Sequence, residues 1–103
     1  MKADDLLHAI EQLAEHLAQP ITQSEFDGGW SAGGKEYWRK IVLQWPETVR
    51  RGTRPLGAPL NGKHLDNSGG GTDGELANEL ERVAAAVHQH YMQRPLWRRL
   101  VGV

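Results

Sequence analysis

The residues whose types and spacing could do chemistry lie in the middle of the chain, beginning with a glycine-rich loop. Residues 28–38 read GGWSAGGKEYW, and the pattern G-x4-G-K that ends at Lys35 has the spacing of a loop that cradles phosphate groups. Such a loop follows a buried strand, and a Ser or Thr after its lysine holds magnesium. Here no run of β-branched residues precedes the glycines, and Glu36, a carboxylate, follows the lysine. We therefore expect no nucleotide here, but a flexible loop that turns tightly around Trp30.

A second candidate for chemistry is the sequence His64-Leu65-Asp66. Alternate side chains of a strand point to one face, so on a strand the imidazole and the carboxylate would lie side by side. Together with Arg51 or Glu47 they would form a site for cleaving phosphodiesters. No other motif supports this site, so a phosphodiester hydrolase is the third of our hypotheses and we predict no catalytic residue.

The other histidines do not have the spacing of a metal site. They are His8, His16, His88 and His90. The first two lie too far apart on one predicted helix to share a metal, and the side chains of the last two diverge on another. The chain has no cysteine, which excludes disulfides and thiolate ligands. We therefore predict neither a metal nor a cofactor.

The candidate contacts with a partner are one tryptophan and a group of cationic side chains. Trp30 lies among glycines, so we expect it to be exposed at a loop tip, where a partner protein could bury it. The cationic side chains surround a stretch with little regular pattern, and they could meet an anionic partner. They are Arg50, Arg51, Arg54, Lys63 and His64.

The net charge of −1 conceals a strong segregation of charge along the chain. Residues 1–34 carry a net −5, residues 35–65 carry +5, residues 66–81 carry −5 and residues 82–103 carry +4. In one interpretation, the acidic and basic faces of a single domain attract each other. In the other, the basic segment 35–65 binds nucleic acid, with arginines on phosphates and Trp30 or Trp45 stacked on bases.

Length and composition fit one small domain that spans residues 1–103. No stretch approaches the roughly 20 apolar residues of a membrane span. The first residues, MKADDLLHAIEQLAEHL, are acidic and patterned, unlike a signal peptide. We therefore expect a cytoplasmic protein without integral membrane association.

Apolar residues at helical spacing predict a first helix over about residues 4–18, which ends before Pro20. Thr22 and Glu25 have the spacing of a capping box, so a short helical turn is expected there. Residues 35–45 predict a second helix that buries Trp38 and Trp45. The face of that helix also includes Tyr37, Ile41 and Val42. Pro46 either kinks it or opens a new turn that Gly52 ends.

Residues 52–71 show the least regular structure of the chain. Asn61-Gly62 is typical of a two-residue hairpin turn, whereas Pro55 and Pro59 restrict the preceding strand to a sheet edge. The sequence NSGGG at residues 67–71 is typical of a flexible linker. We expect a long irregular loop that includes at most a short β-hairpin.

The third main helix is predicted to begin in a capping box, Thr72 to Glu75, and to end near Gln93. Its buried stripe is Leu76, Leu80, Val83, Ala84, Val87 and Tyr91. The last residues, PLWRRLVGV, predict a short amphipathic turn.

The sequence thus predicts a mostly α protein, a small bundle of three main helices. The first functional hypothesis is a non-enzymatic binding module, an adaptor or regulator that binds another protein. Nucleic-acid binding through residues 35–65 is the alternative, and a homodimer is compatible with either. The first hypothesis follows from the lack of a convincing catalytic set, together with the small size and the segregated charge.

Overall fold

The computed structural model describes residues 2–58 and 74–93. Within these residues the chain forms five helices: α1 (Ala3–Ala18), α2 (Gln23–Asp27), α3 (Ala32–Val42), α4 (Trp45–Arg51) and α6 (Glu75–Met92). No strand occurs in this part of the chain. The predicted mostly α bundle is therefore confirmed. The hairpin at Asn61-Gly62, the linker 67–71 and the C-terminal turn lie outside the described residues.

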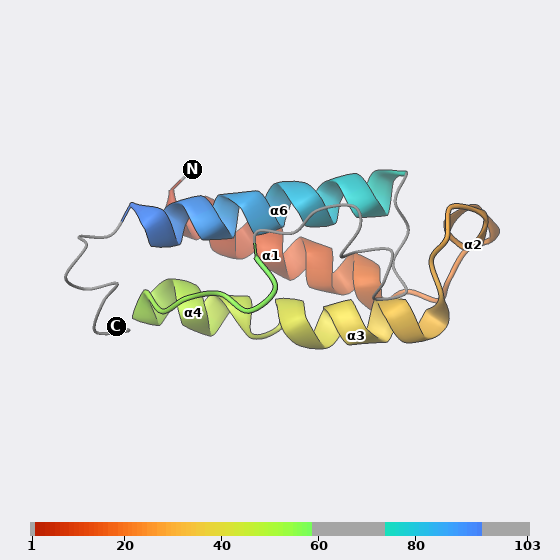
Figure 1. Cartoon of the computed structure of the whole chain (residues 1–103), viewed down its shortest axis with the longest axis horizontal. Coiled ribbons are helices and arrows are strands. Elements are labelled where there is room, and N and C mark those ends of the chain that lie inside the picture. Colours follow the sequence, from red (N-terminus) through yellow and green to blue (C-terminus); the bar gives the residue numbers. More distant parts are fainter. Residues whose placement is uncertain (1, 59–73, 94–103) are drawn as a thin grey trace.

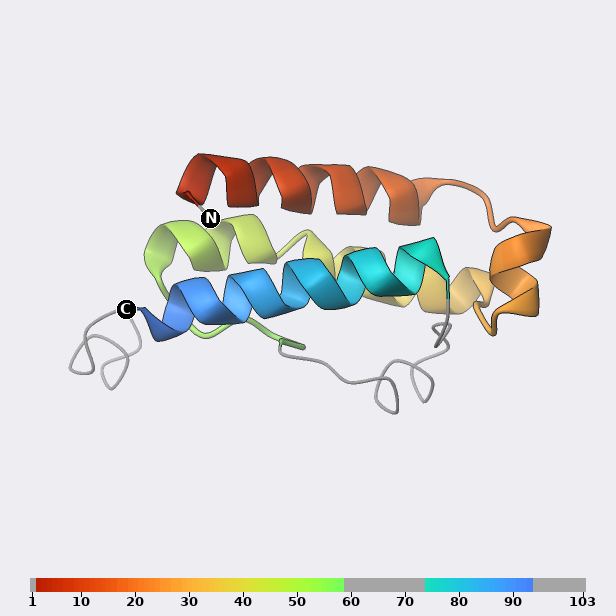
Figure 2. The same ribbon diagram turned by 90° about the horizontal axis from the view of Figure 1, so that it is seen from above.

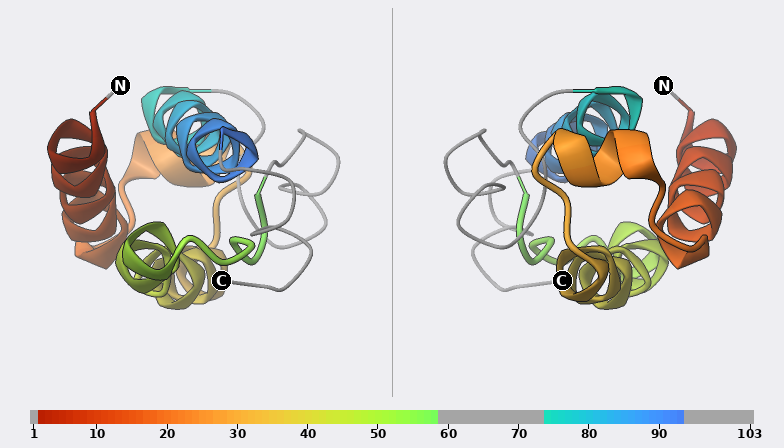
Figure 3. Two further views of the ribbon diagram at one scale, coloured as in Figure 1. Left: turned by 90° about the vertical axis from the view of Figure 1, so that its left-hand side faces the viewer. Right: turned by 90° about the vertical axis from the view of Figure 1, so that its right-hand side faces the viewer.

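Helices α3 and α4 follow one another in a row, and we call them together the α3–α4 rod (Figure 1). The chain runs along α1 in one direction and along the α3–α4 rod and α6 in the other. Seen from above, α1 runs along one side of the molecule with α6 and the rod beside it (Figure 2). Seen end-on, three rods, namely α1, α6 and the α3–α4 rod, occupy the corners of a triangle, and α2 lies across one end (Figure 3).

Helix α1 has the bounds that its sequence predicts, within one residue. Asp4 and Asp5 lie in its first turn, where a carboxylate interacts favourably with the unpaired amides of the helix N-terminus. The helix ends at Gln19, whose extended backbone leads into Pro20. Its apolar stripe is buried: Leu6, Ile10, Leu13, Ala14 and Leu17.

The second predicted helix is divided at Leu43 and Gln44. Pro46 stands in the first turn of α4, where its missing amide hydrogen costs nothing, and Gly52 ends that helix in the left-handed conformation (φ 72°). Of the two alternatives predicted for Pro46, a kink or a new helical turn, the structure shows the new turn, α4. Trp38 and Trp45 are fully buried, as expected, but Tyr37 is 47% exposed. Tyr37 lies one residue round the helix from Trp38 and packs edge-on against its ring instead.

The segment after α4 packs over the tryptophans of the α3–α4 rod. Trp45 Nε1 donates a hydrogen bond of 2.7 Å to the carbonyl oxygen of Leu56. Gly57 has a φ of +79°, and a Cβ there would lie 3.2 Å from Ile41 Cγ2 and 3.3 Å from Trp38. Only glycine combines this backbone conformation with so close an approach.

Helix α6 begins later than its sequence predicts. Its N-cap is Gly74, with a φ of 104°, and no side chain caps it. Because this φ is not helical, the helix begins at Glu75. Thr72, the first residue of the predicted capping box, lies outside the described residues. The rest of α6 agrees with prediction. The helix ends at Met92 with Gln93 as its C-cap, and its stripe from Leu76 to Val87 is buried, with Tyr91 half-buried.

One hydrophobic core joins the three rods. Buried residues of α1 and α6 meet Trp30, the two tryptophans of the α3–α4 rod and Val49 in a single cluster. Burial of large side chains is the main source of stability in a domain of this size.

Substitution of Leu13, which is completely buried, should therefore affect stability far more than substitution of an exposed leucine. We predict that Leu13→Ala lowers the free energy of unfolding by about 2–5 kcal/mol. Leu43→Ala and Leu56→Ala, at 51% and 57% exposure, should each change it by about 0.5 kcal/mol or less. Urea unfolding followed by circular dichroism measures all three. Equal losses at the three positions would contradict this core.

Candidate functional site

The glycine-rich loop 28–34 is more ordered than its sequence predicts. Ser31 is the N-cap of α3, and its Oγ accepts a hydrogen bond of 2.8 Å from the amide of Gly34. Gly33 and Gly34 therefore belong to the first turn of the helix rather than to a flexible connector. A cap of this kind stabilises a helix by about 1 kcal/mol, which offsets the entropy cost of one of these glycines.

Trp30 is 2% exposed, so the prediction of an exposed anchor at a loop tip is wrong. The backbone folds back at this point because the amide of Trp30 donates to the carbonyl oxygen of Glu25, at 2.9 Å. This bond directs the indole into the core. Trp45 is equally buried, so neither tryptophan offers a surface on which a base could stack.

Lys35 is buried as well, at 3% exposure, although the sequence placed it in a basic surface segment. Its Nζ donates a hydrogen bond of 2.8 Å to Oε1 of Glu25. The same carboxylate closes the predicted capping box of α2, because Glu25 Oε1 accepts from the amide of Thr22 and Thr22 Oγ1 accepts from that of Glu25. Glu25 thereby connects α2 to α3, and its carboxylate binds the ammonium group of Lys35 within the fold.

Two opposing effects set the pKa of Glu25. Desolvation by itself would raise this pKa. The hydrogen bonds from Lys35 and Thr22 and the positive charge of Lys35 outweigh desolvation, so the pKa of Glu25 lies below its ordinary value. A lowered folded-state pKa means that the pair stabilises the fold fully above the ordinary glutamate pKa of about 4.3. That stabilisation is lost as the pH falls through the lowered value.

The other predicted contacts divide into two groups. Arg50, Arg51 and Arg54 are exposed around the end of α4, and Arg51 forms an ion pair of 2.6 Å with Glu47. Lys63 and His64 lie outside the described residues, as does Asp66 of the hydrolase hypothesis. Among the described candidates, the structure exposes the three arginines around the end of α4 and buries Trp30 in the core.

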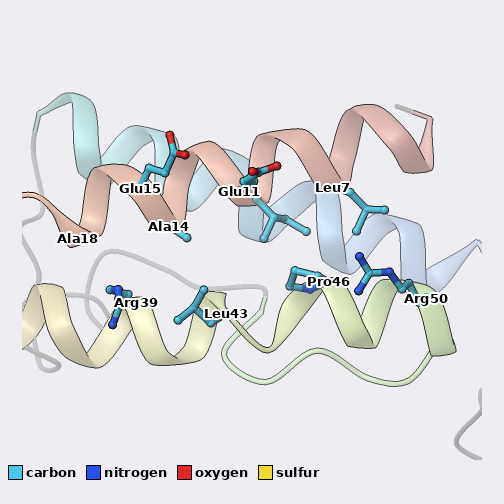
Figure 4. A pocket seen from close by; sticks show the side chains of 10 residues that line it. Leu7, Glu11, Ala14, Glu15, Ala18, Arg39, Leu43, Pro46 and Arg50 are labelled. Atoms are coloured by element: carbon cyan, nitrogen blue, oxygen red, sulfur yellow. The ribbon is translucent and has the colours of Figure 1, made fainter.

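A groove that the sequence analysis missed runs between α1 and the α3–α4 rod (Figure 4). It has a volume of about 420 Å³. From α1 it is lined by Leu7, Ile10, Glu11, Ala14, Glu15 and Ala18, and from the rod by Arg39, Leu43, Pro46 and Arg50. We call this site the α1/rod groove.

The two walls of the α1/rod groove carry opposite charges. Glu11 and Glu15 lie on α1, and Arg39 and Arg50 lie on the rod (Figure 4). Among the described residues, Glu11, Glu15 and Arg50 have no ion-pair partner, while Arg39 has only a distant one, Glu36, at 3.6 Å. The walls therefore do not close on each other through salt bridges, and their charges can interact with a molecule in the groove.

Another cavity, of about 570 Å³, is lined by residues from the end of α1, the start of α2 and the start of α6. His16 Nδ1 is 2.7 Å from Glu79 Oε1 there, which ties α1 to α6. Among the described residues, no hydroxyl bonds to this histidine. Since His16, Glu79 and Glu25 already bond within the fold, this cavity is the weaker candidate.

Comparisons of the chain with protein-family models, curated proteins and solved structures find no match in any of the three. Function must therefore be argued from the groove itself. Two further findings limit the choice. No three metal-ligating side chains cluster in residues 2–58 and 74–93. None of the helices in these ranges has the length and apolar character needed to cross a bilayer.

The Lys35–Glu25 pair gives a testable effect of pH on stability. At neutral pH, Glu25→Gln should lower the free energy of unfolding by about 1–3 kcal/mol, because it leaves a buried ammonium without its carboxylate. Adding Lys35→Met should recover part of this loss. The difference between wild type and Glu25→Gln should shrink as the pH falls through the lowered pKa of Glu25, because the carboxylate of the wild type then becomes protonated. Urea unfolding at a series of pH values from neutral downward measures this, and a constant difference would disprove it.

Proposed function

We propose that this protein is a non-enzymatic binding module, an adaptor or regulator that holds a segment of another protein in the α1/rod groove. The observation that carries the proposal is the α1/rod groove itself. Apolar side chains form most of its lining, and the charged side chains on its two walls form no salt bridge with each other. Leu43, at 51% exposure, lies at its edge. An exposed leucine beside a concave apolar surface is a typical anchor position for a partner.

Of the three exposed arginines that the sequence predicts as contacts, this proposal keeps one. Arg50 stays, since it forms part of the groove wall, whereas Arg51 and Arg54 lie outside the groove lining. The nucleic-acid alternative is less well supported, because Trp38, Trp45 and Lys35 of its segment are buried and offer no surface to a base or a phosphate. A protein partner is therefore the function that we favour.

We predict that Leu43→Asp abolishes capture of the partner, since it places a carboxylate against the apolar face of the bound segment. The tagged protein is used as bait in an extract of its native cell, with and without nuclease, and the captured proteins are identified. Leu56→Asp is the matched control, because Leu56 is equally exposed and lies outside the groove. Capture that Leu43→Asp and Leu56→Asp leave equally intact would refute the proposal, and capture that nuclease abolishes would favour nucleic acid.

A further inference from the structure

Both walls of the α1/rod groove present a line of side chains at the same spacing. On α1 the line is Leu7, Glu11, Ala14 and Ala18, and on the rod it is Arg39, Leu43, Pro46 and Arg50. Steps of four, three and four residues keep a line of side chains on one side of a helix. The rod keeps this spacing across the break between α3 and α4. The groove is therefore bordered by two helical ridges that run side by side.

The length of the groove defines the length of its occupant. Each line spans twelve residues, and the eleven steps between its ends correspond to roughly 16 Å or three turns of α-helix. Alanines at positions 14 and 18 allow a close approach at one end, while Leu7, Leu43 and Pro46 supply apolar contact along the rest. This shape accommodates one further helix packed against both walls, as in a four-helix bundle.

An extended peptide would fit the groove less well than a helix. The described residues contain no strand, so the groove offers no sheet edge to bond a peptide backbone. An extended segment would therefore leave amide and carbonyl groups without partners against apolar side chains, at a cost in free energy. A helix satisfies these groups internally and buries only its apolar face.

We propose that the occupant of the groove is an amphipathic helix of about three turns, with basic side chains on one flank and acidic side chains on the other. The basic flank lies against Glu11 and Glu15 of α1, and the acidic flank lies against Arg39 and Arg50 of the rod. This inference rests on the proposed function and adds the chemistry of the partner. Its basis is charge complementarity with walls that have no salt bridge to each other.

The opposite charges of the walls also determine the direction of the helix. Turning a helix end for end in the groove exchanges its two flanks. A helix with one basic and one acidic flank therefore matches both walls in only one direction. A helix with like charge on both flanks matches one wall and is repelled by the other, whichever way it lies.

The test uses three synthetic amphipathic peptides with the same leucine and alanine face. The first has lysine on one flank and glutamate on the other, the second has lysine on both and the third has glutamate on both. We predict from the wall charges that the mixed peptide binds about tenfold more tightly than either of the others, and that salt reduces the difference. Fluorescence anisotropy of labelled peptides, titrated with the wild-type protein, measures the three values of Kd.

A pair of chain variants makes the test sharper. Arg39→Glu combined with Arg50→Glu renders both walls acidic, so this variant should prefer the peptide with lysine on both flanks. Arg51→Glu combined with Arg54→Glu makes the same change of charge outside the groove lining. That matched control should still prefer the mixed peptide. Circular dichroism melts verify that both variants are folded.

The outcomes separate this inference from the proposed function. If the three peptides bind equally well and Leu43→Asp abolishes their binding, the inferred charge pattern of the bound helix is wrong, while the proposal that the groove binds a protein segment stands. Binding of no peptide, together with a concentration-dependent dimer that Leu43→Asp dissociates in sedimentation, would overturn the inference and assign the groove to a second copy of the chain. Binding of no peptide without such a dimer would overturn the inference, and the cell-extract experiment would then decide the proposed function alone.

Discussion

Proline at position 46 is the constraint on which the shape of the molecule depends. It has no amide hydrogen for the carbonyl of Val42, so one regular helix cannot run from Ala32 to Arg51. The break is mild, because Leu43 and Gln44 keep right-handed helical angles and the amide of Gln44 bonds to the carbonyl of Ile41 at 3.1 Å. The two helices therefore continue in one row (Figure 1).

Two consequences follow from this continuity. Trp38 and Trp45 are seven residues apart, and both reach the core because the rod does not turn between them. The groove line of the rod, from Arg39 to Arg50, stays on one side for the same reason. The α3–α4 rod thus contributes both to the core and to the groove. Helix α1 does the same, since one of its stripes packs in the core and the adjacent stripe forms the opposite wall of the α1/rod groove. The function that we propose thus depends on the same packing that stabilises the fold.

Local patterns in the sequence were sufficient to predict most of the helices. The apolar stripes of α1 and α6, the capping box at Thr22 and the new turn at Pro46 all depend on neighbouring residues. Trp30 and Lys35 could not be placed in this way. Their burial depends on Glu25. Its backbone carbonyl accepts a hydrogen bond from the amide of Trp30, and its side-chain carboxylate accepts one from the ammonium of Lys35. The groove was missed because it depends on how two rods lie together, although the repeated four-three-four spacing on each was readable.

In the function that we propose, the α1/rod groove is occupied when the protein binds its partner. Because the chain has no cysteine, a single one can be introduced at Ala18 in the groove, and another at Leu56 outside it as a control. The measurement is the rate of alkylation of each thiol with and without the mixed-charge helical peptide. At a peptide concentration about ten times its Kd, alkylation of Ala18→Cys should slow about tenfold, while that of Leu56→Cys should not change. Equal rates for Ala18→Cys with and without bound peptide would contradict the account.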